Sequence, residues 1–481
     1  MIRLQFEVFP VGTFLLEKPI FLPISINISQ IDLIWFILIM YYDNKERGRH
    51  MKIGHLIRAE RVRQDMKQIV LAKGICTPSY LSKIERNLIE PSEDIAELLF
   101  NRLGIDPAKL QKKDVKTEKE FKELLLSTYK LVITSRSVEL TEKKLDYLLQ
   151  NSPLFENDSL YYTYLLITLR FRIILGKNFE EISREIEALS DSVDGFDTYQ
   201  KYLFLLNQAL FYYNSGIRKK AISYFEEIVE DLDKIPLGDW EKAEFYYVIA
   251  ILYTSDENTF VAIEYIRKAL NYFMETLQMN RVLECYIIIG VTRKLNEQFE
   301  ESLEAYSKAM QLCEEFHLDD QKGIIYHNIG NLNSIMGNSE QAILYFKKSY
   351  DSKVVDNEKL ISILCLIMEH SKRAEKALVL KWANIGIDII QESEVEGRQS
   401  YLHHFKFYKS LHSEEGLSEE IALAAIQYFK DIQEFKLTHK YCIALADWYY
   451  YNRKYKLSSI YYREANTYGN IYRKIVKWED L

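Results

Sequence analysis

The sequence predicts an all-α protein with a small helical domain near its amino terminus and a long helical solenoid behind it. Glycine and proline are scarce, at 17 and 8 of 481 residues, and no proline follows Pro236. A β-rich chain of this length needs more turn residues, and proline interrupts helices, so the long proline-free part should be helical. Similar phrases also recur about every 40 residues, a pattern that is typical of stacked helical repeats.

The composition excludes several broad classes of protein. Apolar residues make up 48% and charged residues 27% of the chain, which is incompatible with a disordered or fibrous protein. The five cysteines are scattered and form no CxxC pair, which indicates free thiols in a reducing compartment. We therefore expect a cytoplasmic protein without a disulfide scaffold or a zinc site.

No sequence motif of an enzyme is present. P-loop, GxSxG, HExxH and DxDxDG phrases are all absent. The densest histidine group is His403, His404 and His412, and without partner cysteines these side chains are expected to lie on the surface or to pack rather than to bind metal. The sequence predicts no catalytic residue, no cofactor and no metal site.

The charge of the chain is divided unevenly along its length. The total of −8 combines a stretch of +4 at residues 51–113 with −12 at residues 114–481, while residues 1–50 are neutral. A small basic module therefore precedes a large acidic one. Any contact with nucleic acid is expected in the basic module.

Residues 1–50 differ from the rest of the chain. They contain three prolines and an apolar run, Leu33–Met40, which is too short to span a bilayer because a helix needs about 20 residues to do so. We interpret this segment as an over-extended start, with the working protein beginning at Met51. The alternatives are an extension that touches a membrane and a strand pair packed on the body.

Residues 51–110 are expected to form a bundle of short helices. Apolar residues recur at helical spacing from Ile53, and a second short helix fits Lys67–Lys73. Its inward residues are expected to be Ile69 or Val70, Leu71 and Ala72.

Two further helices carry clear boundary signals. Thr77 is a good N-cap and Pro78 suits the first helical position, which predicts a three-turn helix over Thr77–Asn87. Another helix is expected over Ser92–Leu103, ending at Gly104.

The phrase LAKGICTPSYLSKIERNLIEPSEDIAELLFNRLGI resembles the helix-turn-helix of the Xre/lambda-repressor-like superfamily, and GICT…SKIE is similar to its NprR and PlcR branch. The resemblance implies that the helix capped by Thr77 enters the major groove of DNA. Pro78 stands where a base-reading Gln is frequent, so specificity should depend on other side chains. Base-edge contacts are assigned to Pro78, Ser79, Tyr80 and Lys83. Ser82 also lies on the outward face, and Arg58, Lys67 and Arg86 are expected to contact phosphates.

Residues 111–121 are almost wholly polar and are expected to be a linker or the exposed start of a connecting helix. Residues 122–481 are expected to be a repeat domain. Small residues open similar phrases at Ala221, Ala262, Ser302, Ala342, Ala425 and Ser459. Further small residues precede four of them by twelve positions, at Ala209, Ala250, Gly290 and Gly330.

The phrase YHNIGNLNSIMGNSEQAILYF resembles a tetratricopeptide repeat. The resemblance implies seven to nine helix pairs in a right-handed solenoid, stabilised by contacts between neighbouring repeats. The resemblance also implies that the concave side binds extended peptides or partner helices. We assign peptide binding to Asn207, Asn328 and Asn331, because an amide can bond a peptide backbone, and to Arg293 for a carboxylate.

A basic helix-turn-helix followed by an acidic repeat array resembles the RRNPP family of peptide-pheromone-responsive transcriptional regulators. The resemblance implies binding to a double-stranded DNA operator, quorum sensing through a short signalling peptide, and a homodimer or higher oligomer whose geometry the peptide alters. The repeat domain would also mediate dimerisation, with Trp448–Tyr462 as a candidate stretch. The alternatives are a Rap-type protein that sequesters a response regulator and a phage receptor for a communication peptide.

Overall fold

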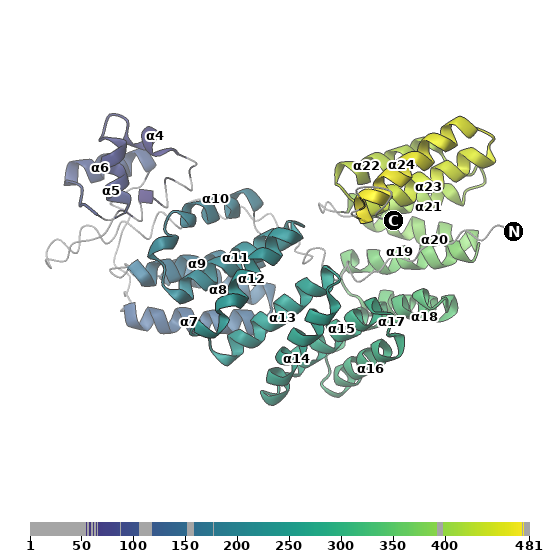
Figure 1. Ribbon diagram of the computed structural model, residues 1–481, viewed down its shortest axis with the longest axis horizontal. Helices are drawn as coiled ribbons and strands as arrows, with labels where there is room; N and C mark the ends of the chain where they lie inside the picture. The colour runs from purple at the N-terminus through teal and green to yellow at the C-terminus, as the bar shows by residue number, and fades with distance from the viewer. Residues whose placement is uncertain are drawn as a thin grey trace. The chain divides into compact units, whose positions relative to one another are not determined.

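The computed structural model describes residues 54, 57–58, 61, 64, 66–86, 88–104, 118–151, 158–176, 178–391, 398–473 and 475 (Figure 1). The interpretation of residues 1–50 as an over-extended start lies outside these residues. The described residues fall into two compact units that divide between Leu252 and Tyr253. We call them the amino-terminal unit and the carboxyl-terminal unit and describe each by itself.

The amino-terminal unit begins with a small helical domain, which we call the head. Its complete helices are α4 (Gln68–Ala72), α5 (Pro78–Glu85) and α6 (Glu93–Leu103), and residues 54, 57–58 and 61 before them are also helical. Nine buried apolar residues form its core: Ile57, Leu71, Ala72, Leu81, Ile84, Ala96, Leu99, Phe100 and Leu103. The predicted short-helix bundle is therefore present.

The boundary signals of the head helices act as expected. The Thr77 hydroxyl accepts a hydrogen bond from the Tyr80 amide at 3.1 Å, and Pro78 occupies the first turn of α5. Helix α6 ends at Gly104, whose φ of +70° is the left-handed conformation expected at a helix end. Helix α5 ends at Glu85, and Asn87 lies outside the described residues.

One expectation for α4 is wrong. We expected Ile69 or Val70 to face inward, but their exposed fractions are 65% and 51%. Helix α4 has only five residues, so little more than one turn of it can pack against α5 and α6. Leu71 and Ala72 are the residues of α4 that lie in the core.

The rest of the amino-terminal unit consists of helices packed in antiparallel pairs. They are α7 (Glu118–Ser135), α8 (Val138–Asn151), α9 (Asp158–Ile174), α10 (Phe179–Ser190), α11 (Thr198–Asn214), α12 (Arg218–Asp231) and the start of α13 (Asp239–Ser255), with short 3-10 turns at Val193–Gly195 and Leu232–Lys234. Phe121, which we placed in the linker, is fully buried in α7. The repeat domain therefore begins at least as early as Glu118.

The carboxyl-terminal unit continues the same arrangement. Its helices are α14 (Thr259–Glu275), α15 (Met279–Leu295), α16 (Phe299–Glu315), α17 (Lys322–Ile335), α18 (Ser339–Ser352), α19 (Asp356–Lys372), α20 (Lys376–Gln391), α21 (Gln399–Leu411), α22 (Glu419–Asp431), α23 (Phe435–Tyr451) and α24 (Tyr455–Arg473), with a 3-10 turn at Asp319–Gln321. The described residues from α7 onward thus contain nine helix pairs, within the predicted range. We call the first helix of each pair the A helix and the second the B helix.

Small residues allow the two helices of a repeat to pack closely. A Cβ added to Gly290 would lie 2.3 Å from the Tyr306 ring, and one added to Gly330 would lie 2.8 Å from the Phe346 ring. Both aromatic rings come from the following B helix. The twelve-residue spacing of small residues therefore marks the contact between an A helix and its B helix, as the sequence indicated.

Two of the assigned small residues are out of register. In α12, α14, α16 and α18 the buried small residue is the fourth residue of the helix. The fourth residues of the later B helices α20, α22 and α24 are Val379, Ala422 and Ser458, and all three are buried. Ala425 is also buried, but it lies one turn further along α22. Ser459 is exposed, so the small residue that packs in the last repeat is Ser458, one position before the predicted one.

The 40-residue period arises from longer helices joined by one recurring turn. Helices α13, α14, α15 and α16 each have 17 residues, and a residue with positive φ follows each of them. These left-handed residues are spaced by twenty, at Glu257, Leu277, Glu297, His317 and Gly337. One helix plus one turn therefore occupies half a repeat throughout this region.

Within each unit the A helices approach one another more closely than the B helices do. Helices α7, α9 and α11 contact in sequence, as do α15, α17, α19 and α21, whereas B helices make no contact of similar extent among the described residues. A stack whose A helices are closer together curves toward them. The A helices therefore line the inner, concave side of each unit.

No helix in the described part of the chain is long and apolar enough to cross a bilayer.

Candidate functional site

Helix α5 presents a polar face to solvent. Thr77, Pro78, Ser79, Lys83 and Arg86 are exposed. Tyr80 and Ser82 are partly buried at the edge of this face, while the opposite face carries the buried core residues of the helix. The residues assigned to DNA contact on this helix thus form one continuous surface, which we call the α5 face.

Lys67 extends the positive charge beyond α5. It is exposed and directly precedes α4, the helix before α5 in the helix-turn-helix. Arg86, at the end of α5, donates a hydrogen bond from Nε to the Ser82 carbonyl at 3.2 Å and leaves the rest of its guanidinium exposed. Both cations are therefore exposed on the helix-turn-helix and are open to solvent.

A buried ion pair that the sequence did not reveal holds α5 in place. Both carboxylate oxygens of Glu85 accept from the Arg61 guanidinium, at 2.5 Å from Nε and 3.0 Å from Nη2. The Gln68 amide donates to the same carboxylate at 2.6 Å, and Arg61 Nη1 donates to the Met66 carbonyl at 2.8 Å. The network joins the first helical segment, α4 and α5, so it fixes the orientation of the α5 face.

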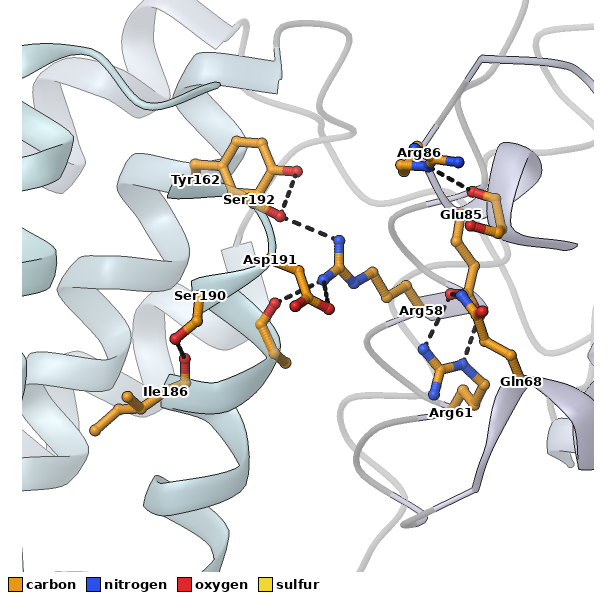
Figure 2. Close-up of polar contacts among 12 residues, drawn as sticks. Arg58, Arg61, Gln68, Glu85, Arg86, Tyr162, Ile186, Ser190, Asp191 and Ser192 are labelled. Atoms are coloured by element: carbon orange, nitrogen blue, oxygen red, sulfur yellow. Dashed lines mark hydrogen bonds and ion pairs between the residues drawn. The ribbon is translucent and has the colours of Figure 1, made fainter. Parts of the chain in front are cut away.

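The assignment of Arg58 as a phosphate contact does not fit this conformation, in which its guanidinium is bonded within the protein. Figure 2 shows its guanidinium pointing at the end of α10 rather than into solvent. It donates to the Ala188 carbonyl at 2.7 Å and forms an ion pair with Asp191 at 3.1 Å. A bond to the Ser192 hydroxyl, also at 3.1 Å, completes the contact. Arg58 thus fastens the head to the first repeats, a tertiary contact without a sequence signal.

The asparagines assigned to peptide binding are buried and engaged in bonds within the protein. The Asn207 amide donates to the Leu166 carbonyl of α9 at 2.8 Å, and its Oδ1 has no partner. The Asn328 amide donates to the Ile324 carbonyl of its own helix at 2.9 Å. Asn207 and Asn328 are 0% and 1% exposed, so neither offers a free amide to an open surface.

Asn331 and Arg293 lie on neighbouring A helices but face different partners. Asn331 Oδ1 accepts from Lys294 Nζ of α15 at 2.9 Å. Arg293 is only partly buried and donates to Gln298 Oε1 at 2.5 Å. Of the two cations side by side on α15, Lys294 faces the inner layer of A helices and Arg293 faces the turn that follows α15.

Polar contacts between successive A helices form a further feature that sequence reasoning missed. The Thr254 and Thr292 hydroxyls lie 3.0 Å apart, and the Lys294–Asn331 bond comes next along the inner side. Lys372 bonds Ser334 at 3.0 Å, and the Ser334 hydroxyl also donates to Glu369. We call this set the inner polar line. It joins successive A helices through buried hydrogen bonds.

The three histidines pack against neighbouring side chains, His404 buried and His403 and His412 partly buried. His403 stacks on Tyr428 with ring centroids 4.4 Å apart, His404 bonds the Tyr441 hydroxyl, and His412 lies 2.8 Å from the Ser371 hydroxyl. The described residues contain no group of three His, Cys, Asp or Glu side chains placed to hold a metal ion.

Comparison with known proteins supports two separate modules. A helix-turn-helix family matches residues 57–110 and a tetratricopeptide repeat family matches residues 285–353. The transcriptional activator NprA of Geobacillus stearothermophilus is 27% identical over 405 residues, which cover 82% of this chain and 97% of that protein. Response regulator aspartate phosphatase I of Bacillus subtilis (strain 168) is 24% identical over 330 residues, covering 64% of this chain and 80% of that protein.

The fold also matches a solved structure of a related type. NprR in complex with its cognate peptide NprX superposes with a TM-score of 0.55 at 19% identity, over 73% of this chain and 99% of that chain. At this identity the match shows the shared fold. It combines with the two family matches to place helical repeats behind a helix-turn-helix.

Proposed function

We propose that this RRNPP-type transcriptional regulator binds an operator in double-stranded DNA through the α5 face and senses a short signalling peptide through its repeats. The observation that carries the proposal is the α5 face, which is polar, cationic and exposed while the buried Arg61–Glu85 pair fixes the helix beneath it. The similarity to the activator NprA, which extends over nearly that whole protein, supports the same function.

Sequence selection is proposed for the start of α5. Pro78 has no side-chain donor, so base edges are read by Ser79, Tyr80 and Lys83, whose side chains can donate hydrogen bonds in the major groove. Thr77 and Ser82 flank them, and Lys67 and Arg86 bind phosphates. Arg58 joins the phosphate contacts only when the head leaves α10.

The peptide is proposed to bind along the inner polar line. Asn331 and Arg293 take part after their present bonds exchange, and Asn328 supports the helix behind them. Asn207, in the amino-terminal unit, is proposed as a separate peptide contact after its bond to the Leu166 carbonyl exchanges. A peptide that prefers one spacing of the A helices shifts the population toward that spacing, because a ligand stabilises the conformation that it binds best. The change reaches the DNA through the relative placement of two heads in a homodimer or higher oligomer.

The test is electrophoretic mobility shift with the full-length protein and the DNA upstream of its own gene. A Tyr80→Ala, Lys83→Ala double variant should lose about 10-fold or more in affinity, since a good base contact is worth about 1–3 kcal/mol. Lys119→Ala, an exposed lysine on α7, is the matched control for the loss of one positive charge. Unchanged operator binding in the double variant contradicts the assignment of α5.

The peptide arm of the test uses synthetic peptides from short reading frames beside the gene. Addition of the right peptide should change either the affinity for operator DNA or the oligomeric state measured by light scattering. A response in neither quantity, for every neighbouring peptide, contradicts the sensor function. Asn207→Ala and Asn331→Ala should weaken the response, and full peptide affinity in this pair contradicts the groove assignment.

A second function is proposed because Rap-type relatives also match the repeats. Response regulator aspartate phosphatase I aligns with 64% of this chain. In this alternative the repeats bind a response-regulator protein and DNA binding is secondary; a phage receptor for a communication peptide is a further variant. Co-purification of a response regulator with the full chain, lost on addition of peptide, distinguishes it. We further propose that the protein acts in the cytoplasm without membrane contact and has no catalytic activity of its own.

A further inference from the structure

Helix α12, a B helix of the amino-terminal unit, carries its charged residues in an unusual order. In sequence they are Arg218, Lys219, Lys220, Glu226, Glu227, Glu230 and Asp231. The dipole of a helix favours acidic residues in the first turn and basic residues in the last. Helices α10, α16 and α22 each have two acidic residues in the first turn, whereas α12 has none there and no basic residue in its last turn. The order of charges in α12 therefore does not serve the stability of the helix itself.

The outward face of α12 shows this order most clearly. Ser223 lies at the centre of the face and is exposed. Two exposed lysines, Lys219 and Lys220, come four and three residues before it. Two exposed glutamates, Glu226 and Glu227, come three and four residues after it. Residues with these spacings share one face of a helix, so α12 presents a basic patch and an acidic patch on either side of one small residue.

The two patches do not neutralise each other within the helix. Lys219 and Glu226 are seven residues apart, which separates them by about 10.5 Å along the axis. Among the described residues, neither Lys219 nor the two glutamates form an ion pair. Lys220 lies over the Tyr212 ring and donates to its hydroxyl at 2.7 Å, so its partner is neutral. The opposite charges of the face are therefore available to another molecule.

This pattern is complementary to a second copy of itself. In an isologous contact the same surface of both copies meets across a two-fold axis. If two α12 helices cross antiparallel with Ser223 at the axis, Lys219 of one copy meets Glu227 of the second copy. Lys220 meets Glu226 of the second copy in the same way. The symmetry repeats both pairings, which gives four ion pairs between the helices.

Ser223 also suits the crossing point sterically. Its side chain is small, and its hydroxyl donates to the Lys220 carbonyl of the same helix at 2.9 Å. It therefore needs no hydrogen-bond partner across the contact. Small side chains at a crossing let the helix axes approach to about 8 Å, the short end of the usual range. The longer side chains one turn away on either side can then meet.

We propose that the outward face of α12 is a self-association surface, on which α12 of a second copy packs antiparallel about Ser223. The inference goes beyond the proposed function, because the contact needs neither DNA nor peptide. Two crossed helices bury less than the roughly 1,200–2,000 Å² of a stable interface, so the association is weak by itself. Because exposed ion pairs are screened by ions, it weakens further as the salt concentration rises.

The test is sedimentation equilibrium of the full-length protein, without DNA or peptide, at about 50 mM and about 500 mM salt. An acidic variant carries Lys219→Glu and Lys220→Glu, and a basic variant carries Glu226→Lys and Glu227→Lys. Each alone should weaken the salt-sensitive association by about 10-fold or more, because like charges then face each other. An equimolar mixture of the two should associate as the wild type does, since an acidic face meets a basic one. A swapped variant with all four changes should also match the wild type.

Matched controls make the same changes of charge on exposed pairs of other B helices. They are Lys347→Glu with Lys348→Glu on α18, and Glu314→Lys with Glu315→Lys on α16. Both should associate as the wild type does. Thermal melting followed by circular dichroism should show the acidic and basic variants folded, because their new charges agree with the helix dipole. If one of them unfolds, the swapped variant still tests the charge pattern.

Three results would overturn the proposal. One is a wild-type protein without salt-sensitive association, and another is a mixture that associates no better than its separate components. The third is an equal loss in the control variants, which would assign the effect to net charge. A swapped variant that fails to associate although it is folded also contradicts the antiparallel arrangement. None of these results affects the proposed binding of DNA or peptide, which is measured separately.

Discussion

Replacing Glu85 by alanine should unfold the helix-turn-helix head while the repeats remain folded. Glu85 is 1% exposed and the Arg61 side chain is 13% exposed, so the substitution leaves a nearly buried guanidinium without its counter-charge. Breaking a buried pair in this way costs about 3–5 kcal/mol. A domain the size of the head, roughly 50 residues, has a total stability of only about 3–8 kcal/mol. The loss is therefore comparable to the whole stability of the head.

Hydrogen exchange with mass spectrometry separates the two parts of the molecule. Peptides from residues 66–104 should lose their protection in Glu85→Ala, whereas peptides from α15 to α18 should exchange as in the wild type. Glu97→Ala, which removes an exposed carboxylate from α6, should change nothing. The double variant Arg61→Met, Glu85→Leu should regain much of the protection, since an apolar pair can replace a buried ion pair. A loss below about 1 kcal/mol in Glu85→Ala would refute the reasoning.

Three further predictions concern other contacts. Arg58→Ala should release the head from α10, because it removes the bond to the Ala188 carbonyl. The efficiency of FRET between one dye on the head and one on α10 should therefore fall. An unchanged efficiency would show that this contact does not hold the head. Gly290→Ala places a Cβ against the Tyr306 ring and should destabilise the repeats by about 1–3 kcal/mol in urea, whereas Gly195→Ala meets open space and should not. Burial lowers the pKa of Lys294 from 10.5 to about 8, so between these pH values the unfolded chain holds a proton that the folded protein has lost. The free energy of unfolding of the wild type, relative to that of Lys294→Met, should therefore rise with pH in this range by up to about 3 kcal/mol. A difference that stays constant between pH 7 and 10 would contradict this.

The sequence was most informative where a signal is local. Thr77 and Pro78 mark the start of α5 because capping depends on neighbouring residues, and Gly290 marks a helix contact because close packing excludes a side chain. In α22 the same rule was ambiguous. Ala422 and Ala425 lie one turn apart on the same face, so both are buried and only the structure shows which one is in register.

The candidate sites depend on contacts that no local pattern encodes. The Lys294–Asn331 bond joins residues 37 positions apart, and the Arg58–Asp191 pair joins residues 133 apart. A Lys, Asn or Arg on the polar side of a helix gives the same sequence pattern whether it faces solvent or a neighbouring repeat. The exposure of the assigned asparagines could not be predicted for this reason.

The left-handed residues spaced by twenty set a rule for changes in chain length. Leu277 and His317 occupy the same place in the turns that end two successive repeats, each just before a new A helix or the 3-10 turn that leads into one. Removal of residues 279–318 would splice one turn onto its own equivalent and delete a complete repeat without altering any remaining turn. In this region a change in chain length that keeps the turns intact therefore comes in steps of one whole repeat, and a duplication that keeps this phase adds one further A helix and B helix to the stack.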